Sequence, residues 1–239
     1  MPSVSKDKRL KVMVNILHTG TIHAGLESKA IGWMSEYRDK YNFELFLPTA
    51  RPIPNNRNTI VRDFLAGDWD ILFMFDDDVL PMVNPFSMLR HDKDVCGGVY
   101  PGRSTKGYNF HVFMLDKKQY PERAFWNFVP PEKREGLQKI DAVATGCVAV
   151  KRHVLEKMIK KGMAPFEELF DKEGTMLTSD DMAFCLKCMK MKIDVYADWN
   201  VMCDHFKETS LLQVIGFILE AARTGKSVIN MEDGIGHHL

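Results

Sequence analysis

Three consecutive carboxylates follow a short apolar run and could bind a divalent cation. Residues 71–75 are too few for a helix and apolar throughout, so they predict a fully buried strand. Asp76, Asp77 and Asp78 come directly after this strand, with no basic residue between them. Like charges this close favour a cation among them, and carboxylate oxygens are ligands for Mg²⁺ and Mn²⁺. The alternative is a solvated acidic turn before a helix that starts near Asn84.

A second acidic pair and a late histidine could also take part in chemistry. Asp180 and Asp181 follow Ser179, a good N-cap for a helix over residues 180–191. One of the two carboxylates could take a proton from an attacking hydroxyl, although acidic residues in a first helical turn also simply complement the helix dipole. His205 follows a strand-like run, and its neutral imidazole could complete a carboxylate metal site or be structural.

Arg57 and Asn58 are candidates for binding a phosphate or a base. They lie near the start of a predicted helix over residues 56–65, which Asn56 can cap. A guanidinium and an amide at a helix N-terminus suit an anionic ligand, whereas an ordinary surface turn is the alternative.

The elements that must position these side chains alternate along the first hundred residues. Strands are predicted at residues 11–17, 43–47 and 71–75, with helices at residues 26–40 and 56–65. This order predicts an α/β fold with a parallel sheet built from right-handed crossovers. In such sheets ligands bind beyond the carboxyl ends of the strands, which is where the aspartate triplet falls.

The second half is predicted to be less regular. Strands are expected at residues 94–100, 140–150 and 193–197, and helices from 81 to about 90 and at residues 153–161, 180–191 and 210–223. Residues 101–138 predict hairpins and loops, residues 163–178 a loop, and the chain from residue 224 weak order. We expect one domain, with a nucleotide-binding half at about 11–100, an acceptor half at about 101–206 and a C-terminal helix and tail at 207–239.

Bulk composition indicates an ordinary globular protein. The 239 residues include 32 basic and 32 acidic side chains, so no overall basic field argues for nucleic-acid binding. No apolar run is long enough for a membrane span, and no secretory signal is evident. Five scattered cysteines favour a reducing, cytoplasmic location. Neither GxGxxG nor GxxxxGK[ST] is present.

The ordered set of motifs resembles GT-A-fold glycosyltransferases of the family-2 type, including small stand-alone bacterial and phage forms. The resemblance covers about residues 11–206 and implies a GT-A-like (Rossmann-like) mixed, mostly parallel sheet flanked by helices. The segments that carry it are Arg57-Asn58, Asp76-Asp77-Asp78, Gly97-Gly98-Val99-Tyr100-Pro101, Thr145-Gly146 with Lys151-Arg152, Ser179-Asp180-Asp181-Met182-Ala183-Phe184-Cys185, and His205.

The resemblance implies transfer from a nucleoside-diphosphate sugar, with a UDP-sugar as donor and Mn²⁺ or Mg²⁺ as cofactor. Asp76, Asp78 and His205 would hold the metal, which would bridge the two donor phosphates and offset the charge on the leaving group. Asp181 would be the catalytic base, assisted by Asp180, which departs from the more usual Glu at that position.

Other parts of the ligand sites follow from the same resemblance. Thr19, Arg57, Asn58, Asp76 and Asp77 would lie near the nucleotide. The aromatic segment at residues 108–128, with Trp126, would contact the acceptor or belong to the core. The acceptor is left open: a glycan, a lipid, a protein or a modified nucleic-acid base.

Two other functions remain open from the residues alone. A nucleotidyltransferase acting on a sugar phosphate would use the same carboxylates in two-metal chemistry, and a second acidic pair near the triplet would favour it. A zinc-stabilised binding module would use Cys185, Cys188, Cys203 and His205, although the first two lie in a context typical of buried apolar residues.

Overall fold

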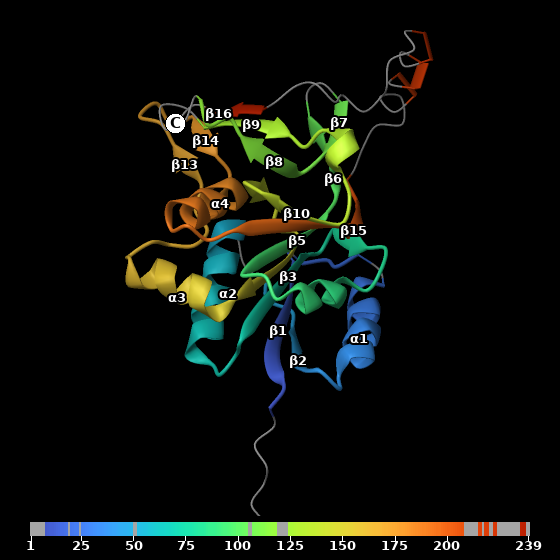
Figure 1. Cartoon of the computed structure of the whole chain (residues 1–239), viewed down its shortest axis with the longest axis vertical. Helices are drawn as coiled ribbons and strands as arrows, with labels where there is room; N and C mark the ends of the chain where they lie inside the picture. The colour runs from blue at the N-terminus through green and yellow to red at the C-terminus, as the bar shows by residue number, and fades with distance from the viewer. Residues whose placement is uncertain are drawn as a thin grey trace, which may run out of the picture.

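A mixed β-sheet forms the centre of the molecule. The computed structural model describes residues 8–18, 20–23, 25–49, 52–104, 107–118, 124–207, 215–216, 218–219, 222–223 and 235–237. Within these residues the sheet has eight strands in the order β10-β15-β5-β12-β3-β1-β2, with β4 beside β15 (Figure 1). The strands are β1 (Leu10–Leu17), β2 (Tyr41–Phe46), β3 (Ile71–Asp76), β4 (Val79–Pro81), β5 (Val95–Val99), β10 (Leu137–Ile140), β12 (Cys147–Lys151) and β15 (Val195–His205).

The sheet is mostly parallel, as predicted. Strands β2, β1, β3, β5 and β15 run in one direction, whereas β12, β10 and β4 run in the other. Strands from both predicted halves of the chain therefore share one sheet. The antiparallel β12 lies between β3 and β5, so its first residue meets the carboxyl ends of its neighbours.

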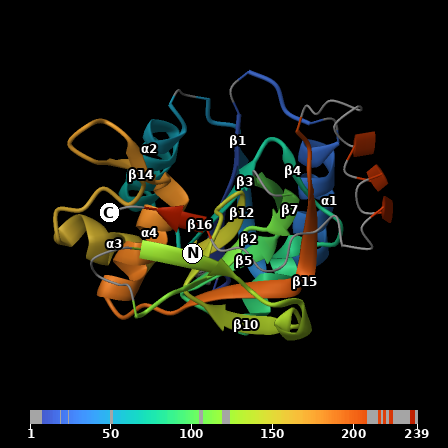
Figure 2. The same ribbon diagram turned by 90° about the horizontal axis from the view of Figure 1, so that it is seen from above.

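Helices cover both faces of this sheet. They are α1 (Leu26–Tyr37), α2 (Ile53–Ala66), α3 (Arg152–Lys160), α4 (Asp180–Lys190) and the 3₁₀ segments η1 (Pro85–His91) and η2 (Pro131–Lys133). Figure 2 shows α2, α3 and α4 on one side of the strands and α1 on the other. Among the described residues, no helix is long and apolar enough to span a bilayer.

The pattern of β1 explains why both faces are covered. Val12, Val14 and Ile16 belong to the core beneath α1, whereas Met13 and Leu17 belong to the core beneath α2. Successive side chains of a strand point to opposite faces, so an all-apolar strand needs a helical layer on each side.

Smaller sheets surround the central one and replace several predicted loops. Strands β8 (Val112–Leu115), β9 (Ala124–Phe128), β11 (Ala142–Val143) and β16 (Ile235–His237) form a four-stranded sheet, and β6 (Pro101–Ser104) pairs with β7 (Gly107–Phe110). Strands β13 (Leu169–Phe170) and β14 (Met176–Thr178) form a hairpin within the predicted loop at 163–178.

Several predicted elements need correction. The single strand predicted at residues 140–150 is three strands, and residues 235–237 pair with β9 where weak order was expected. Most of the helix predicted at residues 210–223 lies outside the described residues; those described within it are helical.

The helix that carries Arg57 also begins earlier than predicted. Helix α2 starts at Ile53 after Pro52, so Asn56 is inside the helix and does not cap it. Pro54 lies in the first turn, where a missing N–H costs nothing, so the helix includes a proline near its start. Arg57 thus has helical neighbours on both sides, which fix its backbone.

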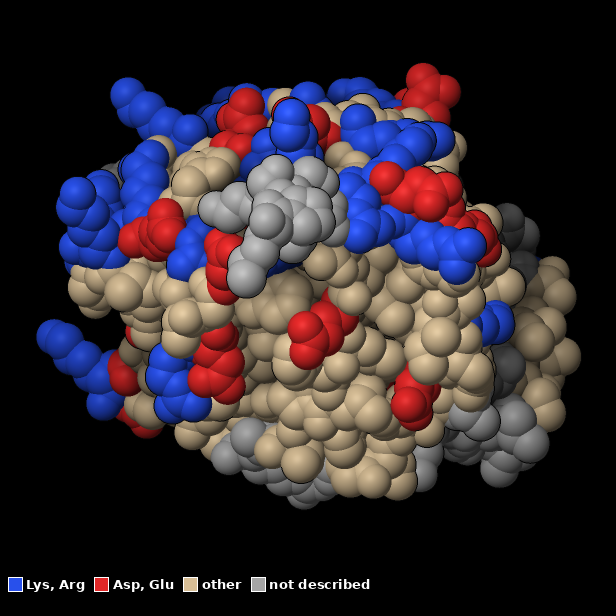
Figure 3. Space-filling view, turned by 90° about the horizontal axis from the view of Figure 1, so that it is seen from below, with Lys and Arg blue, Asp and Glu red and all other residues tan. Residues whose placement is uncertain are grey.

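The face below the sheet carries charges of both signs. Figure 3 shows Lys and Arg side chains interspersed with Asp and Glu along one part of this face, beside a broad area where charged side chains are sparse. Ion pairs occur where strands start or end at this edge, including Lys11–Asp68 and Lys139–Asp194. On the face shown, the described charged side chains therefore form no large patch of a single sign.

Candidate functional site

The carboxyl edge of the sheet brings the predicted site residues together. Strand register places Leu17 opposite Asp76, the last residues of β1 and β3. The N–H of Asp76 donates to the carbonyl of Gly146 at 2.9 Å, so the turn before β12 lies directly beside the aspartate. The first turn of α4, with Asp180 and Asp181, reaches the same edge.

One buried arginine joins three of the predicted carboxylates. Arg57 Nη2 donates to both oxygens of Asp76 at 2.8 and 3.0 Å, while Nη1 donates to Asp180 at 2.6 Å and Asp181 at 2.9 Å. The Arg57 side chain is only 3% exposed. Burial lowers its pKa, but the three carboxylates outweigh that effect and hold the pKa well above its usual range. Arg57 is therefore a permanent internal cation that ties α2, β3 and α4 together.

Asp181 has the properties of a general base. Its Oδ1 accepts from Arg57 and from the Thr145 hydroxyl. Burial raises the pKa of Asp181 to about 6, aided by Asp180 and Asp76 and opposed by Arg57 and Thr145. A carboxylate with a pKa near 6 binds a proton more strongly than an ordinary aspartate yet is ionised at neutral pH.

A tyrosine and a glycine complete the wall beside Asp76. Tyr100 is 4% exposed, and its hydroxyl accepts from the N–H of Gly146 at 2.9 Å. Burial, Asp181 and Asp76 all raise the pKa of Tyr100, so the phenol stays neutral. A Cβ at Gly146 would lie 2.6 Å from the Tyr100 hydroxyl and 3.0 Å from Asp76 Oδ2. Glycine is therefore required by close packing.

Asp78 and His205 form a second group at the same edge, where β4 pairs with the end of β15. His205 Nε2 lies 3.7 Å from Asp78 Oδ2, and Lys207 Nζ donates to the same oxygen. Burial raises the pKa of Asp78, but His205 and Lys207 lower it to about 2. His205 Nδ1 lies 2.8 Å from the carbonyl of Pro101, and since a carbonyl only accepts, Nδ1 is the donor in this hydrogen bond.

This pair fits a divalent cation. A ligating histidine commonly donates its other N–H to a carbonyl, and the negative charge of Asp78 is already balanced by a cation, Lys207. Among the described residues Asp76 does not join them as a third ligand, and its carboxylate binds Arg57. The described residues contain no group of three or more metal-ligating side chains, so phosphate oxygens would have to complete the shell.

The remaining nucleotide-site predictions have different outcomes. Thr19 lies outside the described residues. Asn58 is engaged elsewhere: its Nδ2 donates to the carbonyl of Phe166 at 2.5 Å and its Oδ1 accepts from the Phe166 N–H at 3.1 Å, which anchors the 163–178 segment. The Asp77 backbone joins β1 to the loop before α1, through Leu17 and His23.

Two further predictions concern buried side chains. Trp126 is 1% exposed and packs against Phe113, so of the two interpretations of the aromatic segment the core is correct for this residue. The zinc alternative fails, because Cys185, Cys188 and Cys203 are buried free thiols and the described part of the chain holds no metal-ligating cluster that includes them.

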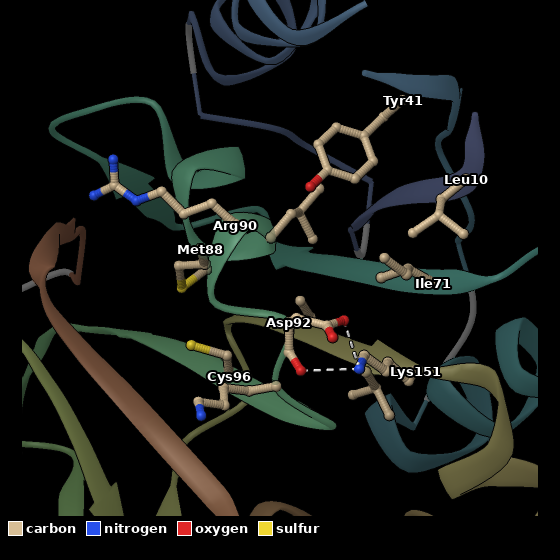
Figure 4. Close-up of a pocket in the computed structure, with 12 residues that line it drawn as sticks. Leu10, Tyr41, Ile71, Met88, Arg90, Asp92, Cys96 and Lys151 are labelled. Carbon is tan, nitrogen blue, oxygen red and sulfur yellow. Dashed lines mark hydrogen bonds and ion pairs between the residues drawn. The ribbon is translucent and has the colours of Figure 1, made fainter. Parts of the chain in front are cut away.

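A cavity of about 200 Å³ lies at the opposite edge of the sheet (Figure 4). Its walls include Leu10 and Ile71, the first residues of β1 and β3, together with Tyr41 and Cys96. Lys151 lines one side and donates to Asp92 at 2.7 Å. The predicted site residues lie at the carboxyl ends of β1 and β3, whereas this cavity lies at their amino ends. The cavity is therefore not part of that site.

Three contributors were not assigned a role from the sequence. Thr145 and Tyr100 lie within motifs that marked the resemblance, but nothing in their spacing indicated contact with the carboxylates. Lys207 lies two residues after His205, so both side chains reach the same aspartate. That short spacing is the only sequence signal for it.

Comparisons with known proteins support the fold. No protein-family model matches the chain, and no curated protein does either. Among solved structures, A197 from STIV is similar with a TM-score of 0.52 and 19% identity over 83% of this chain and 87% of that chain. The likeness shows that the two chains share a fold.

Two glycosyltransferase structures also match, more distantly. GalNAc-T7 with UDP, GalNAc and Mn²⁺ has a TM-score of 0.48 and 11% identity over 90% of this chain and 48% of that chain. The Drosophila galactosyltransferase 7 complex with manganese, UDP-Gal and xylobiose has a TM-score of 0.41 and 12% identity over 83% and 71%. Likenesses at this level support no conclusion about the reaction.

Proposed function

We propose that this chain is a metal-dependent glycosyltransferase that moves a sugar from a UDP-sugar to an acceptor hydroxyl with inversion. The observation that carries the proposal is the grouping at one sheet edge of a base, Asp181, with a cation-binding pair, Asp78 and His205. Inverting transfer needs both: a base for the nucleophile and positive charge for the leaving group.

Asp181 acts on the acceptor. Its carboxylate takes the hydroxyl proton while the acceptor oxygen forms a bond to the anomeric carbon of the donor. The bond from that carbon to the diphosphate oxygen breaks, and its electron pair leaves with the nucleoside diphosphate. In-line attack inverts the anomeric configuration. The raised pKa of Asp181 suits this task at neutral pH.

Asp78 and His205 would hold Mn²⁺ or Mg²⁺. When bound, the cation supplies the positive charge that offsets the charge developing on the diphosphate. Lys207 donates to Asp78 and is 61% exposed, so its ammonium is free to turn from the carboxylate to a phosphate oxygen. The single lysine thereby balances charge at Asp78 before the donor arrives.

Arg57 and Asp180 organise the site. Arg57 holds Asp76 and Asp181 in fixed relation, so the end of β3 and the first turn of α4 cannot move independently. Asp180 binds the same guanidinium at 2.6 Å and helps to balance its charge. Arg57 therefore differs from the phosphate-binding arginine expected from the sequence.

Nucleotidyl transfer is the second candidate. An acidic pair beside Asp76, here Asp180 and Asp181, is the feature that would favour it. However, the Arg57 guanidinium lies between the two acidic groups and donates to both, which disfavours a second metal ion there. Release of inorganic pyrophosphate from a nucleoside triphosphate would support this reaction instead.

The proposal is tested by following nucleotide release. Purified protein would be incubated with UDP-sugars, Mn²⁺ and a panel of glycan, peptide and lipid acceptors, and free UDP would be measured. We expect UDP release that depends on Mn²⁺ and falls at least 100-fold in Asp181→Asn. Unchanged UDP release in Asp181→Asn would contradict the assignment of Asp181 as the base. Pyrophosphate as the product would show nucleotidyl transfer in place of glycosyl transfer.

A further inference from the structure

The two oxygens of the Asp181 carboxylate have different surroundings. Oδ1 accepts two hydrogen bonds, from Arg57 Nη1 at 2.9 Å and from the Thr145 hydroxyl. Oδ2 accepts none from any residue that the structure describes, and this oxygen is not buried. The side chain is 20% exposed. The open oxygen is therefore the one that solvent can reach.

We propose that Thr145 and Arg57 are positioning residues that clamp Oδ1 of Asp181 and thereby make Oδ2 the atom that receives the acceptor proton. This inference rests on the proposed function, because it names the atom within that site that does the work. It also adds Thr145, whose hydroxyl had no assigned role, to the residues that the reaction requires.

The clamp is rigid because further hydrogen bonds hold Arg57 and the residue next to Thr145. Arg57 is fixed by its two hydrogen bonds to Asp76 at 2.8 and 3.0 Å. Thr145 is fully buried, and the adjacent Gly146 is held through both its N–H and its carbonyl, by Tyr100 and Asp76 respectively. Two donors from separate elements fix the plane of the carboxylate, which one donor could not do.

The clamp also controls when Asp181 is ionised. Burial raises its pKa most, and hydrogen bonds to Oδ1 oppose that rise because they favour the charged form. The titratable groups that face Asp181 come from three elements and from the residue after β5. They are Arg57 of α2, Asp76 of β3, Asp180 and Cys185 of α4, and Tyr100. Of these groups only Arg57 is cationic and favours ionisation of Asp181. The Thr145 hydroxyl favours it as well, as a neutral donor.

The test removes the hydroxyl and keeps the shape of the side chain. Thr145→Val loses the donor, whereas Thr145→Ser retains it. Thr178→Val is the matched control, because Thr178 is also fully buried but its hydroxyl has no partner among the described residues. The pKa of Asp181 would be measured by carbon-13 NMR of aspartate carboxyls, with Asp181→Asn used to assign the resonance.

We expect Thr145→Val to raise the pKa of Asp181 and to shift the acidic limb of the transfer pH profile upward by the same amount. Transfer at neutral pH should fall at least tenfold, while Mn²⁺-dependent UDP binding stays unchanged. Thr145→Ser should restore both the pKa and the rate, and Thr178→Val should change neither.

The outcomes separate this inference from the proposed function. An unchanged Asp181 pKa in Thr145→Val, with the fold intact by circular dichroism, would overturn the clamp whatever reaction is catalysed. A raised pKa in a protein that transfers no sugar would leave the clamp in place and refute the glycosyltransferase. A raised pKa with an unshifted pH profile would overturn Oδ2 as the proton acceptor.

Discussion

Arg57 binds Asp76 through two hydrogen bonds from one nitrogen, at 2.8 and 3.0 Å. Asp76 is one of three carboxylates that surround the Arg57 guanidinium. Asp180 and Asp181 complete the group from the first turn of α4. Removal of the arginine would leave three partly buried carboxylates to repel one another.

We predict that Arg57→Met lowers the free energy of unfolding by about 3–5 kcal/mol at neutral pH, the range for breaking a buried ion pair. Urea denaturation would measure it. The loss should shrink at acidic pH, where the carboxylates are protonated. Arg62→Met on the same helix is the control, because Arg62 is 72% exposed and should change stability by less than about 0.5 kcal/mol. Equal effects of the two substitutions would refute the central role of Arg57.

The raised pKa of Asp181 predicts how stability changes with pH. Its pKa is about 6 in the folded chain and about 4 when unfolded, so its contribution to stability is complete below about pH 4. That contribution is lost as the pH rises through 6. Relative to Asp181→Asn, the wild-type protein should therefore lose about 1–3 kcal/mol between pH 4 and pH 7. Parallel stability curves for the two proteins would contradict the assigned pKa.

Gly146 should not tolerate a side chain. An added Cβ would lie 2.6 Å from the Tyr100 hydroxyl and 2.9 Å from Val79, both in the packed core. Gly146→Ala should cost about 1–3 kcal/mol of stability and displace Asp76. Gly32→Ala in α1 is the matched control, since nothing lies within 4 Å there, and it should stabilise by about 0.5–1 kcal/mol. Thermal unfolding would show whether Gly146→Ala lowers the stability and Gly32→Ala raises it.

Lys207 should compete with a cation for Asp78. Its ammonium donates to the same carboxylate oxygen that faces His205 Nε2. Lys207→Met should therefore bind Mn²⁺ more tightly in the absence of nucleotide, by several-fold, when followed by calorimetry. In the presence of UDP the gain in Mn²⁺ affinity should vanish or reverse, because the variant lacks the ammonium that would bind a phosphate oxygen of UDP. Lys160→Met on the exposed face of α3 should alter neither titration.

The fold was largely predictable because hydrophobic periodicity and the order of elements determine it. The apolar run at 71–75 and the alternation of strands with helices are enough to predict the parallel part of the sheet. The short strands after residue 100 were not predictable, because two- and three-residue strands such as β11 carry no periodic signal.

The site was predictable only in part. The aspartate triplet could be placed at the carboxyl edge of the sheet from the buried strand before it, whereas Asp181 was assigned to the same site only through the family resemblance. The connection of Asp76 to Asp181 through Arg57 could not be predicted, because a buried arginine and a surface arginine look alike in sequence. The same holds for Asn58, whose amide binds the backbone of Phe166 rather than a ligand.

The central claim is tested most directly by calorimetric titration of UDP into the protein with and without Mn²⁺. Wild-type protein and Asp181→Asn should both bind UDP only when Mn²⁺ is present, whereas Asp78→Ala should lose at least 100-fold in affinity. Asp194→Asn, at the opposite edge of the sheet, should bind as the wild type does. Failure to bind UDP or GDP with Mn²⁺, or binding that is the same in Asp78→Ala, would contradict a metal-dependent nucleotide-sugar transferase.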